Sequence, residues 1–350
     1  MFLNESLRGF LPYTPGEQPK DMARLIKLNT NENPFPPSPM AVEAITKSEI
    51  EGLRLYSDPD CARLIEAIAG FHCVSEEMIF PGNGSDEVLA LIFHGMCENG
   101  AAFPDITYGF YRVFAELFGV RYTEIPLKAD FSVAVDDYAD FPGTVFLANP
   151  NAPTGICLPL TEVERLLRQN TRRLVVVDEA YVEFGGESAE ALLGEYDNLI
   201  VVRTFSKSHS LAGARIGYAV SSAETIKELN TLKFSFNPYN INRLSIILGA
   251  AAMRDREYFE DCRSKVIENR DYITHELKNL GFNVLESKAN FIFAGDNPKI
   301  SGEKFYLELR QRGILVRYFN IPRISSYVRI TIGTREQMQA LVCAAKETVK

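Results

Sequence analysis

From about residue 60 onward, short apolar runs alternate with helical patterns, and this alternation limits the possible folds more than any other feature of the sequence. Each run is too short for a helix and is rich in β-branched residues, which favours buried strands. Strands that alternate with helices form a mostly parallel sheet with helices on both faces, so we predict an α/β fold. The clearest runs are TVFLA (144–148), LVVV (174–177), LIVV (199–202) and IGYAV (216–220).

Helices are expected between these runs. One follows the SDPD turn and carries Leu64 and Ile68 on its apolar face, and a second opens at Ser85 and runs toward Met96. A third begins at Thr161, where the T-x-x-E pattern predicts a capping box. Past residue 235 the pattern changes to long amphipathic helices, followed by the strand-like segments FNVLES, ANFIFAG, ILVRYF and YVRITIG, which indicate a smaller α+β unit.

These changes of pattern divide the chain into three parts. Residues 1–29 are rich in proline and form an extended arm that packs with the small domain. Residues 30–250 form a large domain and residues 251–350 a small one. A chain of 350 residues with 46% hydrophobic residues has ample material for both cores.

Charge and cysteine spacing exclude several classes of function. The formal net charge of -9 repels a phosphate backbone, so we expect no nucleic-acid partner. The first residues mix charges with prolines, and no apolar stretch is long enough for a membrane span, so we expect a cytoplasmic protein without membrane contact. The six cysteines show no C-x-x-C pair and no zinc-ligand spacing, which predicts six buried, reduced thiols and no metal site.

Polar motifs follow three of the predicted strands. TVFLA runs into the NPNAPTG segment with Asn151, LVVV into DEAY with Asp178 and Tyr181, and LIVV into RTFSK with Lys207. In open α/β sheets ligands bind beyond the carboxyl ends of the strands. The sequence therefore predicts that an amide, a carboxylate and an amine meet at one site.

The three groups suit an aldehyde cofactor on a pyridine ring. A lysine amine forms an imine with the aldehyde, and an aspartate that faces the ring nitrogen keeps the ring protonated, so that it accepts carbanion electrons. The cofactor's phosphate needs an anion site, and PGNGSDE (81–87) has the form of a glycine turn that leads into a helix N-terminus.

Each motif alone has an ordinary structural interpretation. NPNAPTG can be a simple turn, Asp178 can cap a helix, and a lone lysine near serines is usually a solvated surface group. Ser85 can be an ordinary helix cap, and Tyr108 in DITYGFYRVF can be a core aromatic. The functional interpretation depends on the conjunction of the motifs.

That conjunction resembles a known superfamily. The segment TFSKSHSLAGARIGY (204–218) is similar to the lysine motif of fold-type I aminotransferases, which depend on pyridoxal 5'-phosphate (PLP). In that motif a phosphate-binding arginine follows the lysine by eight residues, as Arg215 follows Lys207 (215 - 207 = 8). NPNAPTG and VDEAY resemble the two preceding motifs, in the same order, and the likeness covers nearly the whole chain.

The resemblance implies a role for each matching residue. Lys207 would hold PLP as a Schiff base and act as the catalytic base, while Asp178 would face the pyridine nitrogen. Asn151 and Tyr181 would contact the ring hydroxyl, and Tyr108 would stack on the ring. The phosphate site would consist of Gly84, Ser85, Asp86, Thr204, Ser206 and Arg215.

Further likeness points to the histidinol-phosphate aminotransferase family. It rests on the arm PYTPGEQP, on KLNTNENP (27–34), on LYSDPD, and on GILVR and VRITIGT near the end. Tyr56 would reach the cofactor phosphate of the second subunit, so a homodimer is implied. Arg329 would bind a substrate carboxylate, Arg317 with Tyr13 a substrate phosphate, and Asn31 would also lie at the substrate.

The activity implied is amino transfer between L-histidinol phosphate and 2-oxoglutarate, giving imidazole-acetol phosphate and glutamate, a step of histidine biosynthesis. An aromatic amino acid aminotransferase or a threonine-phosphate decarboxylase on the same frame is the alternative. A non-catalytic PLP-binding domain of a regulator is a remote one, because this acidic chain has no room for a basic DNA-binding module.

Overall fold

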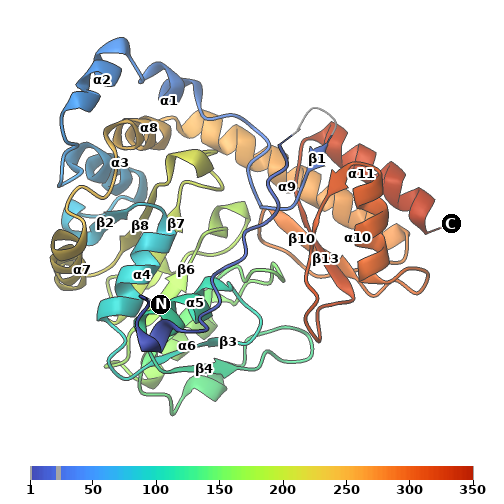
Figure 1. Ribbon diagram of the computed structural model, residues 1–350, viewed down its shortest axis with the longest axis horizontal. Coiled ribbons are helices and arrows are strands. Elements are labelled where there is room, and N and C mark those ends of the chain that lie inside the picture. Colours follow the sequence, from blue (N-terminus) through green and yellow to red (C-terminus); the bar gives the residue numbers. More distant parts are fainter. Residues whose placement is uncertain (1, 21–24, 350) are drawn as a thin grey trace.

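The computed structural model describes residues 2–20 and 25–349, which are arranged around a central seven-stranded sheet (Figure 1). The strand order is β2-β8-β7-β6-β5-β3-β4. Only β8 runs against its neighbours, so the sheet is mostly parallel and the predicted α/β class is confirmed. The strands are β2 (Ile79–Gly82), β3 (Ala101–Pro104), β4 (Tyr122–Ile125), β5 (Thr144–Ala148), β6 (Val175–Asp178), β7 (Leu199–Thr204) and β8 (Gly217–Val220).

Helices cover both faces of this sheet because successive side chains of a strand point to opposite sides. On one face Val176 and Ile200 pack under α4 (Ser85–Gly95) and α5 (Phe110–Phe118), together with residues of α7 (Ala223–Phe236). On the other face Val177 and Val201 pack under α6 (Leu160–Gln169). A third apolar cluster joins α3 (Ala62–His72) and α8 (Arg243–Arg254) to β2 and β8.

Most elements agree with the sequence-based prediction, since all four predicted strands and the helices at 62 and 85 are present. The capping box at Thr161 was wrong. The helix α6 begins at Leu160 after Pro159, whose extended backbone provides the N-cap without a side-chain hydrogen bond. Glu164 instead contacts Arg168 one turn later, on the exposed side of the helix.

A second sheet of four strands, ordered β12-β13-β10-β9, follows the long helix α9 (Arg256–Asn279). Its apolar side packs against α9, α10 (Gly302–Gln311) and α11 (Arg335–Thr348). Its strands are β9 (Asn283–Val284), β10 (Phe291–Gly295), β12 (Arg317–Tyr318) and β13 (Tyr327–Thr331). The domain limits at residues 29 and 250 stay a prediction.

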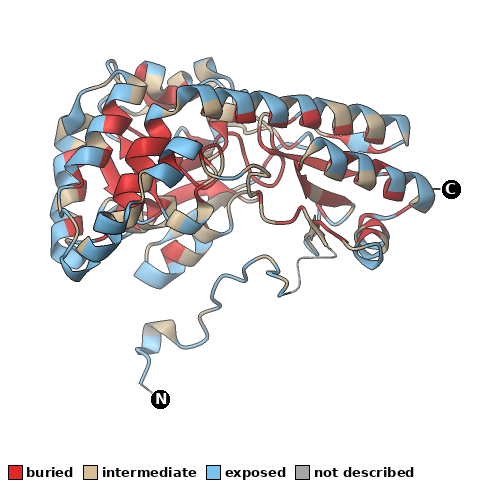
Figure 2. Ribbon diagram, turned by 90° about the horizontal axis from the view of Figure 1, so that it is seen from above, coloured by how far each residue is buried: buried red, intermediate tan, exposed pale blue. Residues whose placement is uncertain are grey.

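The N-terminal segment runs mostly without regular structure, apart from a short 3-10 turn at Glu5–Leu7 (Figure 2). Strand β1 (Ile26–Lys27) then pairs in parallel with β11 (Ile314–Leu315), next to the second sheet. The short helices α1 (Pro39–Glu43) and α2 (Lys47–Glu51) follow. Within residues 2–20 and 25–349, no helix combines the length and the apolar character that a membrane crossing requires.

All six cysteines are free, but they are not all buried. Cys61, Cys97 and Cys262 are buried, Cys157 is partly buried, and Cys73 and Cys343 are exposed, so the expectation of six buried thiols was wrong. Cys73 follows the last turn of α3 in a left-handed conformation, where the chain meets solvent.

Candidate functional site

Two adjoining cavities open beyond the carboxyl ends of the central strands. The inner cavity has a volume of about 230 Å³ and the outer cavity about 460 Å³. The inner one is lined by the ends of β6 and β7 and by the start of α4, whereas the outer one extends to β12 and β13. Five residues line both cavities: Thr30, Tyr108, Ala152, Tyr181 and Lys207.

Asp178 is the last residue of β6 and lines the inner cavity. It shares the face of Val176, so its carboxylate points toward α5, where its Oδ2 accepts a hydrogen bond of 3.0 Å from the Tyr111 hydroxyl. Its Oδ1 accepts a second bond of 3.3 Å from the backbone N–H of Ala180. Burial raises the pKa of Asp178 to about 6, although both hydrogen bonds oppose the shift.

Lys207 lies in the turn after β7, where its side chain separates the two cavities. Its amine donates to the carbonyl of Thr30 at 3.3 Å, and the backbone carbonyl of Lys207 accepts from Asn33 at 2.9 Å. Burial, together with the positive charge of Arg329, lowers its pKa to about 8. A lysine in this state supplies a neutral amine far more readily than a surface lysine does.

The start of α4 forms one end of the inner cavity. Gly84 precedes the helix with φ +79, and a side chain there would collide with the Arg215 guanidinium at 2.5 Å. Gly217 allows the helix start to lie against β8, since an added Cβ would be 2.1 Å from the N of Ser85. Ser85 is the first helical residue and caps nothing, so the interpretation as an ordinary cap was wrong.

Charged and hydroxyl groups converge at this helix start. Arg215 pairs with Asp86 at 2.9 Å while remaining nearly half exposed, and Thr204 and Ser206 line the same cavity. Backbone N–H groups of a helix start, hydroxyls and a guanidinium are groups that can together bind an anion such as a phosphate.

Two tyrosines separate the inner cavity from the outer one. The Tyr108 hydroxyl donates to Asp86 at 2.7 Å, which orients its ring along the cavity wall. The Tyr181 hydroxyl accepts from Asn31 at 3.1 Å, and the Lys207 amine lies 5.8 Å from the centroid of the Tyr181 ring. Burial raises the pKa of Tyr181, so its phenol is protonated near neutral pH.

Arg317 and Arg329 face each other as partners on the antiparallel strands β12 and β13, and both line the outer cavity. Like charges directly opposite each other are unfavourable unless an anion binds between them. Within the described residues neither forms an ion pair with a carboxylate. Arg329 donates only to the carbonyl of Asn29 at 3.1 Å, and its buried Nε has no partner. Tyr13 also lines this cavity, stacked on Phe110.

Three of the predicted site residues line neither cavity, and one of them is Gly84 at the start of α4. Asn151 is buried, and its amide is already bonded to Thr107, to Thr154 and to the carbonyl of Ile106. Tyr56 is 80% exposed and stacks on Tyr239 at a centroid distance of 4.6 Å, away from the cavities of its own chain. The roles of both stay predictions.

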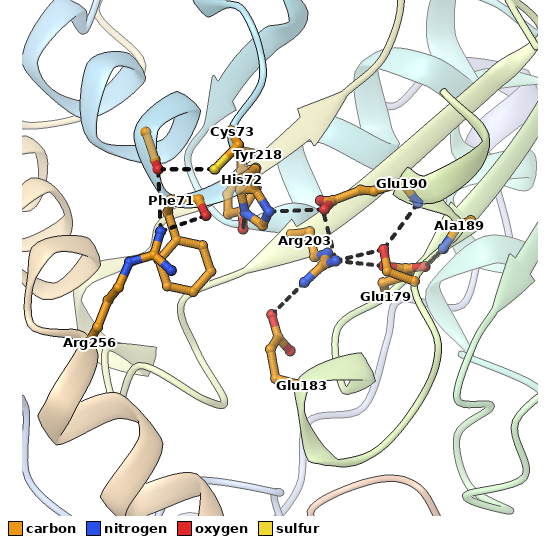
Figure 3. A network of polar contacts seen from close by, with 12 residues as sticks. Phe71, His72, Cys73, Glu179, Glu183, Ala189, Glu190, Arg203, Tyr218 and Arg256 are labelled. Carbon is orange, nitrogen blue, oxygen red and sulfur yellow. Dashed lines mark hydrogen bonds and ion pairs between the residues drawn. The ribbon is translucent and has the colours of Figure 1, made fainter. Parts of the chain in front are cut away.

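A charged cluster lies on the opposite face of the same two strands (Figure 3). Arg203 of β7 contacts three carboxylates at 3.0 to 3.2 Å, those of Glu179, Glu183 and Glu190. His72 places its Nδ1 at 2.9 Å from Glu190. Burial raises the pKa of Glu179 to about 7, although Arg203 opposes that shift. The sequence analysis missed this cluster.

Tyr111 and Asn33 were also missed. Tyr111 carries no motif of its own, although it stands three residues after Tyr108, so that one turn of helix relates them. Asn33 lies in the quoted segment KLNTNENP, but nothing in the segment indicates a contact with the Lys207 turn. In the part of the chain that the structure describes, no group of three or more His, Cys, Asp or Glu side chains is placed to hold a metal ion.

Comparisons with known proteins agree with this geometry. Residues 23–344 match the family model "Aminotransferase class I and II". The chain is 47% identical to histidinol-phosphate aminotransferase of Brachyspira hyodysenteriae, over 100% of this chain and 99% of the relative. It is 48% identical to the enzyme of that name from Clostridium acetobutylicum, over 99% of each chain.

A solved structure gives the same result for the fold. The histidinol-phosphate aminotransferase of Sinorhizobium meliloti, in complex with pyridoxal-5'-phosphate, superposes with a TM-score of 0.87 at 25% identity, covering 100% of this chain and 98% of the other. The chain therefore belongs to the class I and II aminotransferase family, and within it to the histidinol-phosphate aminotransferases.

Proposed function

We propose that this enzyme transfers an amino group between L-histidinol phosphate and 2-oxoglutarate, with PLP as its cofactor. The observation that carries the proposal is the convergence of Lys207, Asp178 and an anion site on one cavity, which opens into a second cavity with two arginines. The relatives that match over nearly their full length have the name of this activity.

The residues of the inner cavity fit PLP. Asp178 is a buried carboxylate that forms no ion pair within the described residues, so a protonated ring nitrogen would complete its bonding. The anion site at the start of α4 suits the phosphate, and the Lys207 amine suits the aldehyde. Bound there, the cofactor supplies an electron sink for the bond that is broken at the substrate carbon.

The proton transfers fall to Lys207. Burial lowers the pKa of the Lys207 amine to about 8, which favours the neutral form that would accept the proton from the substrate Cα. The Thr30 carbonyl orients the Nζ, and Asn33 fixes the backbone of the turn that carries it. Asp178 would hold a proton on the ring nitrogen by its negative charge, and Tyr181, whose phenol is protonated, would donate to the ring hydroxyl.

The arginines of the outer cavity would hold the two substrates in turn. Histidinol phosphate and 2-oxoglutarate share no group apart from an anion distant from the reacting carbon, and the α-carboxylate belongs only to the keto acid. Arg329, with its unpartnered Nε, suits a carboxylate close to Lys207. Arg317 suits the substrate phosphate, with Tyr13 and Asn31 at the same cavity.

We infer that the working unit is a homodimer in which Tyr56 serves the neighbouring site. Tyr56 is among the exposed apolar side chains of one stretch of the surface, which also includes Ile50, Leu53 and Leu55. If Tyr56 acts across the interface, an inactive Lys207→Ala chain mixed with a Tyr56→Ala chain restores one complete site per hybrid dimer. Activity that stays absent after subunit exchange has been demonstrated would contradict this arrangement.

The substrate is tested with purified enzyme loaded with PLP. We expect rapid half-reactions with histidinol phosphate and glutamate, slower ones with phenylalanine and tyrosine, and no release of carbon dioxide from threonine phosphate. An aromatic amino acid that reacts faster than histidinol phosphate would replace the proposed substrate, and carbon dioxide release would replace the reaction class.

A further inference from the structure

Tyr111 lies behind the carboxylate that faces the inner cavity. Its side chain is fully buried on α5, and its ring packs between those of Phe93, Phe103 and Phe146 at centroid distances of 5.7 to 6.3 Å. These contacts leave its hydroxyl one direction, toward Asp178 Oδ2 at 3.0 Å. A phenol fixed by three aromatic neighbours is a rigid donor.

The hydrogen bond acts on Asp178 alone among the cavity groups. Burial raises the pKa of Tyr111 well above its ordinary value, so the hydroxyl keeps its proton and can only donate to the carboxylate. The other groups that face Asp178 are Asp86 on α4, which raises its pKa, and Lys207, which lowers it. The phenols of Tyr108 and Tyr181 also lie near, from the start of α5 and the end of β6.

We propose that Tyr111 is a positioning residue for the cofactor, which keeps the Asp178 carboxylate ionised and turned so that it meets the ring nitrogen. The bond from Tyr111 and the bond from the Ala180 N–H hold one oxygen each, which fixes the carboxylate plane. Without Tyr111 the carboxyl would rotate and would protonate at a higher pH. This inference rests on the proposed function.

The test is the affinity of the apoenzyme for PLP, measured by equilibrium dialysis for wild type and Tyr111→Phe between pH 5 and 8. Loss of a hydrogen bond to a charged group weakens binding about tenfold or more. The loss of affinity on the acid side should begin about one pH unit higher in the variant, because an Asp178 carboxyl with a higher pKa is already neutral there.

A cofactor analogue separates positioning from a general effect on the fold. In the analogue a C–H group replaces the ring nitrogen, so Asp178 has no proton to hold, and we expect wild type and Tyr111→Phe to bind it equally. Tyr138→Phe is the matched control, since Tyr138 is buried, lies outside both cavities and has a hydroxyl without a partner. We expect its affinity for PLP to equal that of the wild type.

Three results overturn the inference. They are equal affinity and equal pH dependence of wild type and Tyr111→Phe, an equal loss for PLP and for the analogue, or the same loss in Tyr138→Phe. A wild-type apoenzyme that binds no PLP at all would instead overturn the proposed function. Thermal unfolding of the apoenzymes shows that each variant is folded before binding is compared.

Discussion

Charged groups lie on both sides of the strand pair β6 and β7, but those on one side line a cavity whereas those on the other side form ion pairs. On the cavity face, Asp178 and Lys207 line the inner cavity, and their hydrogen bonds leave each group able to bind a further partner. On the other face, Glu179, which follows Asp178 directly, and Arg203 of β7 contact each other at 3.0 Å and are buried. From Asp178 to Glu179, one step along the chain thus leads from a group that is open to a ligand to a group in an ion pair.

This difference shows how the chain supports a reactive site. Asp178 and Lys207 have shifted pKa values and lack a full set of partners, and both features lower the stability of the folded chain. The paired cluster lies directly behind them, where Arg203 joins β7 to Glu183 and to Glu190 in the segments that follow β6. We therefore expect substitutions on the cavity face to change activity and those on the core face to change stability.

The largest expected effect lies on the cavity face. Lys207→Ala should lower kcat by about 10⁴-fold or more, because no second amine in the cavity replaces the base. The free energy of unfolding of the apoenzyme should remain near that of the wild type. Turnover and urea unfolding are the measurements, and Lys288→Ala, outside both cavities, is the control. Retained turnover in Lys207→Ala would remove this lysine from the mechanism.

On the core face, Arg203→Met should lower the free energy of unfolding by about 3 to 5 kcal/mol, because it leaves buried carboxylates without their cation. The folded variant should still bind PLP, since Arg203 lines neither cavity. Urea unfolding measures the loss, and Arg165→Met, in an exposed ion pair, should show no measurable change. If Arg203→Met were as stable as the wild type, the charged cluster would not contribute to the stability of the fold.

Two adjacent carboxylates provide the sharpest comparison. Asp178→Asn should lower kcat by about 10² to 10³-fold, because the amide has no charge for the ring nitrogen, whereas Glu179→Gln should keep kcat within a few-fold. The two variants change one atom each, at neighbouring positions. Similar losses of kcat in both would contradict the separation of the two faces.

Their pH dependence has a definite sign. Burial raises the folded pKa of Glu179 to about 7, so the folded state holds a proton that the unfolded state releases at lower pH, and stability is lost as pH rises through this window. Glu179→Gln should therefore flatten the fall in the free energy of unfolding from about pH 4.5 to 7. Asp178→Asn should flatten a lower window that ends near pH 6 in the apoenzyme. Urea unfolding across pH 4 to 8 distinguishes the two windows.

The residues of the cavity face could be predicted from the sequence, whereas the charged cluster of the core face could not. Asp178 directly follows one apolar run and Lys207 lies in the turn after another, so their position at one edge of the sheet follows from the strand pattern. Glu179, Glu183 and Glu190 resemble surface charges in sequence, and only the packing of distant segments buries them against Arg203. Tyr111 was missed for the same reason, because its partner is 67 residues away.

The wrong prediction at Thr161 has a local cause. The T-x-x-E pattern fits a helix cap at Thr161, but Pro159 provides the N-cap with its extended backbone, so the helix begins at Leu160. For Asn151 the structure shows an amide bonded to Thr107 and Thr154, and its contact with the cofactor stays a prediction. A motif identifies the loop but does not determine the direction of each side chain.

The smallest expected effect separates the two arginines of the outer cavity. Arg317→Ala should lower kcat/KM of the half-reaction with histidinol phosphate by about 10 to 100-fold, since a charge-assisted bond to phosphate contributes about 1.5 to 3 kcal/mol. The half-reaction with glutamate should lose less. Arg329→Ala should show the reverse order, because the positive charge of Arg329 acts on Lys207 and its guanidinium suits the α-carboxylate.

Single-turnover kinetics of each half-reaction in both variants provides the measurement. Arg317 and Arg329 are directly opposite each other on β12 and β13, and both line the outer cavity. The two variants therefore remove the same kind of group from neighbouring places in one cavity. If Arg317→Ala lowers both half-reactions equally, the two guanidiniums share each anion, and Arg317 no longer argues for a phosphorylated substrate. Selection of histidinol phosphate would then have to come from other residues of the outer cavity, such as Arg112 and Glu124, which form an ion pair.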